Sequence, residues 1–361
     1  MNDTTSNDPG GKRPNPVLDT IGLGAWMDTV DIGTGAPIQA HYLTGGSQNE
    51  IFEIRRGDFH GALRKPPPGA PDSRNGGILR EWRIIEALAG TDVPHAHGYA
   101  VCTDPSVLGG TFYLMGFVDG WSPMGEAFPE PFRSTVETQA GLAFEVVRGV
   151  ACMSRVDWQA KGLGDLGRPD GYHDRQVERW TRFYDRVKTR EIPGFTETTA
   201  WLDAHRPLDF VPGLMHGDYQ FANVMFRHDA PAQLAAIIDW EMGTIGDPKI
   251  DLAWAVQMWP DQGKAHNANN YIDLTHMPTR DELVEYFVRE SGRQCDDIDY
   301  YIVLARWKLA IVLEQSYKYV TQSDTDDDTL ARFGPLILDL MGRAADLAHT
   351  TDLPKAKKPH G

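Results

Sequence analysis

Three polar clusters between residues 214 and 253, each flanked by apolar runs, constrain the fold of this chain more than any other feature. The first runs from His216 to Asn223, the second follows an apolar run that ends at Ile238, and the third starts at Gly246. The apolar runs at 224–226 and 236–238 predict two short strands, each with an acid or an amide at one end. The polar side chains at these strand ends are the first candidates for chemistry.

The spacing of these polar residues fits phosphoryl transfer. That reaction needs a carboxylate that orients an attacking hydroxyl and accepts its proton, together with oxygen ligands that hold Mg²⁺ against the phosphates. Asp218 and Asn223 are five residues apart, as in a catalytic loop whose Asp faces the nucleophile and whose Asn faces the metal. Asp239 is placed as a second metal ligand at a strand end, and one Asp with one Asn suits Mg²⁺.

The three clusters resemble the motifs of the aminoglycoside phosphotransferase and choline kinase superfamily, which has a protein-kinase-like fold. The resemblance is carried by His-Gly-Asp-x-x-x-x-Asn at 216–223, Ile-Asp-Trp-Glu at 238–241 and Gly-Asp-Pro-x-x-Asp-Leu-Ala at 246–253. It implies that Asp218 is the catalytic residue and that Asn223 and Asp239 bind magnesium.

Three further residues of these clusters are expected to support the site. His216 is expected to orient the loop by bonding to the backbone, because Asp218 lies nearer the expected chemistry and is the better candidate for the base. Asp251 begins an apolar helix, where a carboxylate needs hydrogen-bond partners, so it is expected to brace the catalytic loop. Glu241 is expected either to reach the metal or to line the cleft, and both alternatives stay open.

The part of the chain before residue 117 has a different pattern, because short β-branched or aromatic runs alternate there with turn residues. This pattern predicts five strands and one helix in βββαββ order, with strands at 38–43, 50–55, 59–64, 96–102 and 111–118 and the helix at 76–89. Beyond it, apolar residues at helical spacing predict mainly helices, near 134–155, 171–190, 197–205, 247–258, 279–291, 297–320 and 329–348.

Together with the resemblance, these patterns predict an α+β chain with a two-lobed, protein-kinase-like fold. The smaller N-lobe, residues 17–116, is expected to be a five-stranded antiparallel sheet with one main helix that binds the nucleotide. The larger C-lobe, residues 117–349, is expected to be mostly helical and to carry the catalytic and metal loops. Polar residues at 1–16 and a lysine-rich run at 350–361 predict a disordered lead and a disordered tail.

Two segments of the N-lobe are candidates for nucleotide contacts. A turn containing Gly45, Gly46 and Ser47 lies where the resemblance places the loop over the nucleotide phosphates, and its backbone N–H groups suit phosphate approach. A plain hairpin turn is the alternative explanation for these residues. The resemblance also implies a connection between the lobes in which adenine bonds main-chain groups near Gly116 and Val118.

The end of the third strand is the candidate phosphate-binding position. Here Arg64 takes the place of the lysine that kinases use to hold the α and β phosphates, and strand alternation directs Lys65 to the other face. Arginine is a good bidentate ligand for phosphate. Glu81 on the following helix is the expected ion-pair partner of Arg64, and exposed charges are the alternative.

Composition narrows the partners and the compartment. The 51 acidic residues exceed the 35 lysines and arginines, and the formal charge of −16 argues against a nucleic-acid partner because phosphates would be repelled. Cys102, Cys152 and Cys295 are far apart, which argues against a disulfide framework and a zinc ribbon and favours a reducing, cytoplasmic compartment. No apolar stretch is long enough for a membrane helix. The Gly-x-Gly-x-x-Gly at 162–167 follows a predicted helix, which argues against a dinucleotide site.

A finer resemblance points to one branch of the superfamily. It extends from about residue 20 to residue 345 and is similar to the kinase-like domains that occur alone in bacteria or fused to acyl-CoA dehydrogenases. The segments that carry it lie at 26–28, 63–67, 91–94, 104–109 and 162–169. The fusion implies a hydroxylated acyl-CoA as one candidate substrate.

These observations lead to two functional hypotheses. The main one is an enzyme that uses ATP, with GTP as an alternative, and Mg²⁺ to phosphorylate a hydroxyl of a small molecule, such as a hydroxyacyl-CoA or another small alcohol. The other is a non-catalytic, nucleotide-binding pseudokinase or scaffold, which Arg64 favours and which the intact Asp218, Asn223 and Asp239 oppose. A protein kinase is disfavoured because the chain lacks the His-Arg-Asp, Asp-Phe-Gly and Ala-Pro-Glu motifs.

Overall fold

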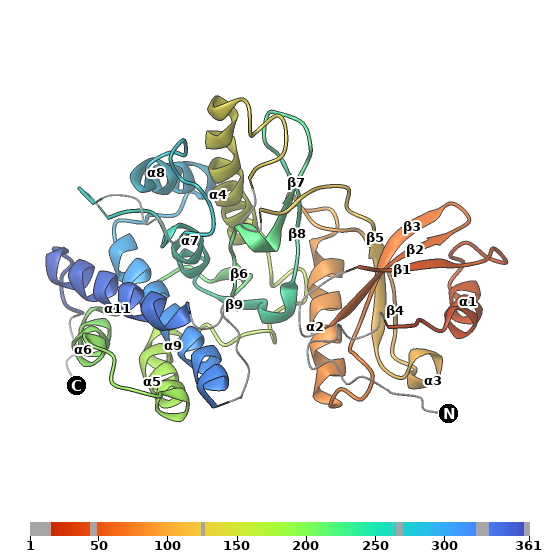
Figure 1. Ribbon diagram of the computed structural model, residues 1–361, viewed down its shortest axis with the longest axis horizontal. Helices are drawn as coiled ribbons and strands as arrows, with labels where there is room; N and C mark the ends of the chain where they lie inside the picture. Colours follow the sequence, from red (N-terminus) through yellow and green to blue (C-terminus); the bar gives the residue numbers. More distant parts are fainter. Residues whose placement is uncertain are drawn as a thin grey trace, which may run out of the picture. The chain divides into compact units, whose positions relative to one another are not determined.

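The computed structural model describes residues 16–43, 49–123, 127–261, 263–264, 270–322 and 332–356 (Figure 1). The chain divides into two compact units: unit 1 comprises residues 1–82 and 96–117, and unit 2 comprises residues 83–95 and 118–361. The division therefore passes through one helix, α2 (Ser73–Leu88). Unit 1 is built around a sheet and unit 2 around helices, which confirms the predicted α+β class.

Unit 1 contains a five-stranded sheet in which all neighbouring strands are antiparallel, as predicted. The strand order is β1-β2-β3-β5-β4. The strands are β1 (Gln39–Leu43), β2 (Glu50–Arg56), β3 (Phe59–Lys65), β4 (Gly98–Cys102) and β5 (Phe112–Gly116). Each predicted strand end lies within two residues of the observed one, because hydrophobic alternation and turn residues mark these short strands clearly.

Alternation along β3 and β5 gives the sheet two different faces. On one face, Leu63 and Leu114 are buried in a core cluster that also includes Leu23 and Met27 of α1 (Thr20–Thr29). On the other face, Arg64 and Tyr113 contact Glu81 of α2. The polar side of the sheet therefore carries the residue that sequence analysis placed at the nucleotide phosphates.

Two helices of unit 1 were not predicted: α1 and the four-residue α3 (Pro105–Leu108). Gly22 and Gly24 lower the intrinsic helix propensity of α1, so that its sequence resembles a loop. The helix forms because Asp19 caps it by accepting hydrogen bonds from the N–H groups of Ile21 and Gly22. Tertiary packing of Leu23 and Met27, four residues apart on one face, outweighs the low propensity.

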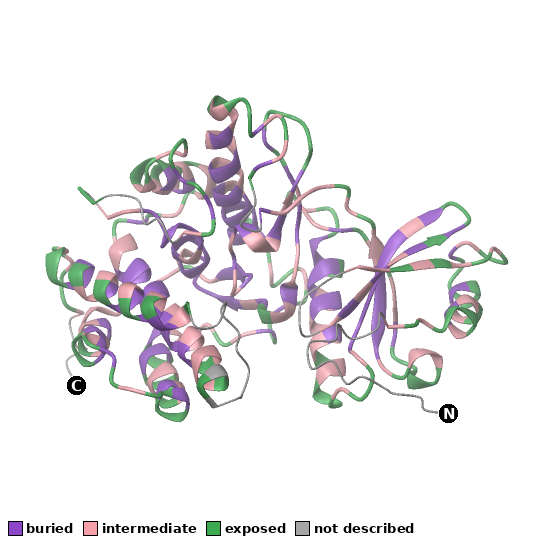
Figure 2. Cartoon of the chain, in the orientation of Figure 1, coloured by how far each residue is buried: buried purple, intermediate pink, exposed green. Residues whose placement is uncertain are grey.

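Unit 2 is mostly helical, and its helices lie where the sequence periodicity predicts them. Helix α4 (Gln139–Arg155) is buried along most of its length (Figure 2). It packs against α8, and α9 packs against α11. The remaining helices are α5 (Gln176–Val187), α6 (Phe195–His205), α7 (Lys249–Val256), α8 (Arg280–Ser291), α9 (Ile298–Gln322) and α11 (Phe333–Thr350).

Two small antiparallel sheets interrupt the helices of unit 2. Strand β6 (Gly213–Met215) pairs with β9 (Thr244–Gly246), and β7 (Val224–Phe226) pairs with β8 (Leu234–Ile237). One-turn 3₁₀ helices precede β7 and follow β8, at Phe221–Asn223 and Trp240–Met242; two more lie at Val136–Thr138 and His173–Arg175. The small sheets bring the three polar clusters of the sequence together.

Several other expectations concern the ends and the surface of the chain. The described part of the predicted tail makes contacts, because the Thr351 hydroxyl donates to Asp299 and the Ala356 N–H donates to the Ala204 carbonyl. The three cysteines are free thiols and are buried. Within the described residues, no helix has the length and apolar character required to cross a bilayer.

Candidate active site

A buried carboxylate, that of Asp251, holds the backbone of the loop that follows β6. Asp251, at the start of α7, accepts hydrogen bonds from the backbone N–H groups of His216 (2.5 Å) and Gly217 (2.9 Å), which confirms its predicted bracing contacts. Burial raises the pKa of Asp251 to about 6. Gly217 has φ of +86°, and a Cβ at this position would lie 2.6 Å from the carbonyl oxygen of Met242, so the turn requires glycine.

His216 orients the loop through its imidazole ring, as predicted. Its Nε2 lies 2.8 Å from the carbonyl oxygen of Ile238, and its Nδ1 accepts a hydrogen bond from the Asp218 N–H at 3.3 Å. A ring that donates from Nε2 and accepts at Nδ1 is the neutral tautomer. With both nitrogens engaged by backbone groups, His216 is not placed to act as the base.

Asp218 has its carboxylate held in place by three hydrogen bonds. Oδ1 accepts from the Trp254 indole N–H (2.8 Å) and the Gln220 amide (3.0 Å), and Oδ2 accepts from the Asn223 amide (3.0 Å). A carboxylate offers about four acceptor positions, so one position on Oδ2 remains for an incoming hydroxyl. Burial raises the pKa of Asp218, and it outweighs the lowering by the neighbouring His216 and by hydrogen bonds from Trp254 and Asn223.

Asn223 and Asp239 lie at the same end of the β7–β8 hairpin. The Ile238 N–H donates to the Asn223 carbonyl at 3.0 Å, so the residue after Ile238 follows directly beside Asn223. Asp239 adopts left-handed backbone angles, with φ of +66° and ψ of +59°. Such a conformation is strained for a residue other than glycine and is typical of functional sites.

The donor set at this hairpin end fits a magnesium ion. The Asn223 amide nitrogen donates to the carbonyl and to Oδ2 of Asp218, so its Oδ1 is the atom that can coordinate a cation. Asp239 and Glu241 each offer a carboxylate oxygen, and these atoms lie within 4.8 Å of one another. An amide oxygen with carboxylate oxygens is the ligand chemistry that Mg²⁺ prefers. Glu241 is half-buried. Whether it reaches the metal or lines the cleft stays a prediction.

Trp254 and Gln220 are site residues that sequence analysis did not find. Trp254 lies in the predicted helix at 247–258, is half-buried and donates to Asp218. Residues three apart on a helix share a face, so the bracing role of Asp251 places Trp254 toward the same loop. That spacing was the available signal. The Gln220 amide also approaches Tyr271, whose hydroxyl lies 3.4 Å from its oxygen.

In unit 1, the predicted ion pair between Arg64 and Glu81 is confirmed. The Arg64 guanidinium contacts both carboxylate oxygens, with Nε 2.8 Å from Oε2 and Nη2 3.0 Å from Oε1. The Tyr113 hydroxyl also donates to Glu81 at 3.0 Å. Lys65 points to the other face, as predicted, and pairs with Glu50 at 2.8 Å. Both members of the Arg64–Glu81 pair are buried, which rules out the alternative of exposed charges.

The other residues predicted to contact the nucleotide are Gly45, Gly46, Ser47, Gly116 and Val118, and the structure describes only the last two. Gly45, Gly46 and Ser47 lie outside the described residues. The Gly116 N–H donates to the His97 carbonyl at 2.7 Å, so this amide is already engaged and a base would have to use other main-chain groups nearby. The roles of Gly116 and Val118 therefore stay predictions.

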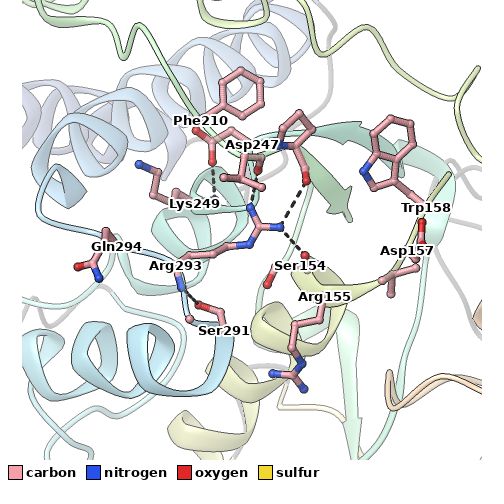
Figure 3. A pocket seen from close by; sticks show the side chains of 14 residues that line it. Ser154, Arg155, Asp157, Trp158, Phe210, Asp247, Lys249, Ser291, Arg293 and Gln294 are labelled. Atoms are coloured by element: carbon pink, nitrogen blue, oxygen red, sulfur yellow. Dashed lines mark hydrogen bonds between the residues drawn. The ribbon is translucent and has the colours of Figure 1, made fainter.

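A hollow of about 790 Å³ in unit 2 is lined by residues that include Phe210, Asp247 and Arg293 (Figure 3). The residues just before β6, including Pro212, line it, whereas the catalytic loop follows β6. Its Arg293 guanidinium donates to the carbonyls of Ser154 (2.5 Å) and Pro212 (3.4 Å). Lys249, also in the lining, pairs with Asp297 at 2.8 Å. Arg293 therefore fixes the residue that precedes β6, and Lys249 is engaged in an ion pair.

A model of the phosphotransferase enzyme family matches residues 41–286. Acyl-CoA dehydrogenase family member 10 of Mus musculus is 29% identical over 320 residues, which cover 86% of this chain and 29% of that protein. The chain spans less than half the length of the first curated relatives that it matches.

Solved structures give the same assignment of fold. A candidate aminoglycoside phosphotransferase from Ralstonia eutropha is 29% identical, with a TM-score of 0.79, and the match covers 94% of this chain and all of that one. Aminoglycoside phosphotransferase APH(4)-Ia, solved in a ternary complex with AMP-PNP and hygromycin B, is 14% identical with a TM-score of 0.56. That match covers 90% of this chain and 99% of the other. At this identity the likeness concerns the kinase-like fold alone.

Proposed function

Because the chain belongs to the phosphotransferase enzyme family, we propose that it is an ATP- and Mg²⁺-dependent enzyme that phosphorylates a hydroxyl group of a small molecule. The observation that carries this proposal is the environment of Asp218. Its carboxylate is oriented by Trp254, Gln220 and Asn223 and keeps one acceptor position on Oδ2. A buried, oriented carboxylate of this kind is what a hydroxyl nucleophile requires.

In the proposed reaction, Asp218 Oδ2 accepts a hydrogen bond from the acceptor hydroxyl. The hydroxyl oxygen forms a bond to the γ-phosphorus of ATP while the bond from that phosphorus to the bridging oxygen of ADP breaks. The hydroxyl proton passes to Asp218. The raised pKa of Asp218 favours this transfer, since it brings the carboxylate closer in basicity to the operating pH. The products are ADP and a phosphate monoester.

The other residues would hold the reactants. Mg²⁺ bound by Asn223 and Asp239 would offset negative charge on the transferring phosphoryl group. In unit 1, Arg64 would hold nucleotide phosphate in a direction set by Glu81 and Tyr113. The left-handed backbone of Asp239 is consistent with a residue that is held for ligand binding at a cost in strain.

For the acceptor and the phosphate donor, the proposal names classes of compound rather than single compounds. Relatives whose names describe acyl-CoA dehydrogenases support a hydroxyacyl-CoA or another small alcohol as the acceptor. A distant structural neighbour that binds AMP-PNP supports ATP as the donor, with GTP as an alternative to be tested beside it.

Substitution Asp218→Asn tests the proposal. We expect turnover to fall by at least about 10²–10⁴-fold, because the amide cannot accept the hydroxyl proton, while Mg²⁺·ATP still raises the melting temperature. The matched control is Asp209→Asn, an exposed acid in the same unit, which should keep full turnover. Equal turnover in Asp218→Asn would remove the assignment. Nucleotide binding without transfer to any hydroxyl compound by the wild type would instead favour the pseudokinase.

A further inference from the structure

Lys308 of α9 is a buried cation close to the proposed catalytic residue. Only 8% of its surface is exposed. Its ammonium nitrogen lies 4.8 Å from the centre of the Trp180 ring and 5.6 Å from the centre of the Trp254 ring. Trp254 is the residue whose indole N–H donates to Asp218. A single indole ring therefore connects the ammonium of Lys308 to the carboxylate that faces the acceptor hydroxyl.

No carboxylate of the described residues forms an ion pair with this ammonium. Among the described residues, no carboxylate lies within 4.0 Å of Lys308 Nζ, and Nζ makes no hydrogen bond. The charged groups that face it are Asp251 and Asp218 on the side of the catalytic loop and Arg179 on α5. The two carboxylates are already used: Asp251 accepts from two backbone amides, and Asp218 accepts from three side chains.

The position of the Lys308 ammonium is unfavourable unless a bound group supplies hydrogen-bond acceptors. An ammonium carries three N–H donors, and drawing them partly out of water without a protein acceptor costs free energy. The faces of Trp180 and Trp254 attract the charge, but they offer no hydrogen-bond acceptor. Burial also lowers the pKa of Lys308 to about 8, so that it remains mostly protonated at neutral pH.

We propose that Lys308 binds an anionic group of the acceptor, so that the small molecule phosphorylated at Asp218 carries a carboxylate or a phosphate in addition to its hydroxyl. This proposal rests on the proposed function. The two indole rings would form the apolar walls between the anionic group and the reacting hydroxyl. A cationic acceptor is excluded on the same grounds, because it would place a second positive charge against Lys308.

Matched acceptors that differ only in charge test this specificity. Glycerate, glycerol 3-phosphate and glycerol form one set, and 3-hydroxybutyrate and 1,3-butanediol form another. We expect the wild type to use one anionic member at least about tenfold better, in kcat/KM, than its neutral match, since a hydrogen bond to a charged group is worth at least this factor. The carboxylate and phosphate arms distinguish the two anionic groups.

Substitution at Lys308 assigns the preference to this residue. Lys308→Met should lose the preference for the anion through a higher KM, whereas Lys308→Arg should keep most of it. Lys318→Met removes a charge from the same helix at a site that bonds to the Arg186 carbonyl, and it should change nothing. A preference retained in Lys308→Met, or a wild type that favours the neutral acceptors, would overturn the proposal.

A binding measurement separates this inference from the proposed reaction. Titration calorimetry with the same anionic compounds, in the presence of Mg²⁺·ADP, does not depend on turnover. Binding to the wild type that is lost in Lys308→Met supports the anion site even if no phosphate is transferred, in which case the proposed function fails alone. If none of the anionic compounds binds or is phosphorylated, the anion site is wrong.

Discussion

The two units bury charge in different ways. In unit 1, Arg64 lies inside the protein with Glu81 against its guanidinium, and Tyr113 donates to the same carboxylate. In unit 2, Lys308 is as deeply buried but has only the faces of two tryptophans beside it. The first charge has its partner within the fold, whereas the second lacks one among the described residues.

This difference separates two roles for a buried charge. Removing one member of a buried ion pair leaves the other uncompensated and is strongly destabilising, so the Arg64–Glu81 pair contributes to the integrity of unit 1. Removing a buried charge that lacks an ion-pair partner relieves a desolvation cost, so we expect Lys308 to lower the stability of the fold. Residues that lower stability in this way are typical of functional sites.

The largest expected effect is on the paired charge. Glu81→Gln should lower the free energy of unfolding by about 3–5 kcal/mol, because it removes the charge of the carboxylate that contacts the buried Arg64 guanidinium at two nitrogens. Urea unfolding measures the loss. Glu86→Gln is the matched control, since Glu86 lies on the exposed side of the same helix. A loss no larger than that of the control would show that the pair does not stabilise unit 1.

The next largest effect on stability is expected at Asp251, whose carboxylate holds the catalytic loop. Asp251→Asn keeps the shape of the side chain but directs an amide group at one of the two backbone N–H donors, those of His216 and Gly217. We expect a loss of about 1–3 kcal/mol in unfolding free energy, together with lower turnover. Unchanged stability and unchanged turnover would contradict the bracing role. Both quantities can be followed in one preparation.

Substitution of Lys308, which has no ion-pair partner among the described residues, should increase stability rather than lower it. Lys308→Met should raise the free energy of unfolding by about 1–2 kcal/mol at pH 7, because it removes an ammonium that lacks a counter-ion and keeps a side chain of similar length. The melting temperature of the purified variant checks the sign. A lower melting temperature than wild type would mean that Lys308 serves the fold, and the contrast with Arg64 would disappear.

The last effect is the pH dependence of the stability difference between Lys308→Met and the wild type. The pKa of Lys308 is lowered by burial to about 8 from an ordinary value of 10.5. Between these values the unfolded chain binds more protons than the folded one, so the unfolding free energy of the wild type should rise with pH relative to Lys308→Met. The stability gap should narrow from pH 8 to pH 10.5. Denaturant titrations across this range would contradict the account if the gap stayed constant.

Sequence reasoning reached the parts of the molecule that depend on local patterns. The sheet of unit 1 follows from hydrophobic alternation, and the loop contacts of His216 and Asp251 follow from motif spacing. Helix α1 was missed because its glycines hide a helix that tertiary packing and the Asp19 cap stabilise.

Residues that act across long sequence separations were not predicted. A tryptophan in an apolar helix is usually a core residue, and only the three-dimensional structure shows that Trp254 donates a hydrogen bond to Asp218. Lys308 lies ninety residues after Asp218 in the sequence, and no local pattern distinguishes it from a surface lysine. Only the packing of α5, α7 and α9 shows that Lys308 contacts two tryptophan rings and that no carboxylate of the described residues pairs with it.

The central claim is that Asp218 serves phosphoryl transfer to a hydroxyl, and ³¹P NMR of the purified protein tests it most directly. With Mg²⁺·ATP and a mixture of small hydroxyl compounds, the account predicts a new phosphate-monoester resonance that grows in step with ADP and is absent in Asp218→Asn. ATP that binds the protein but yields no ester and no ADP with any hydroxyl compound would contradict it.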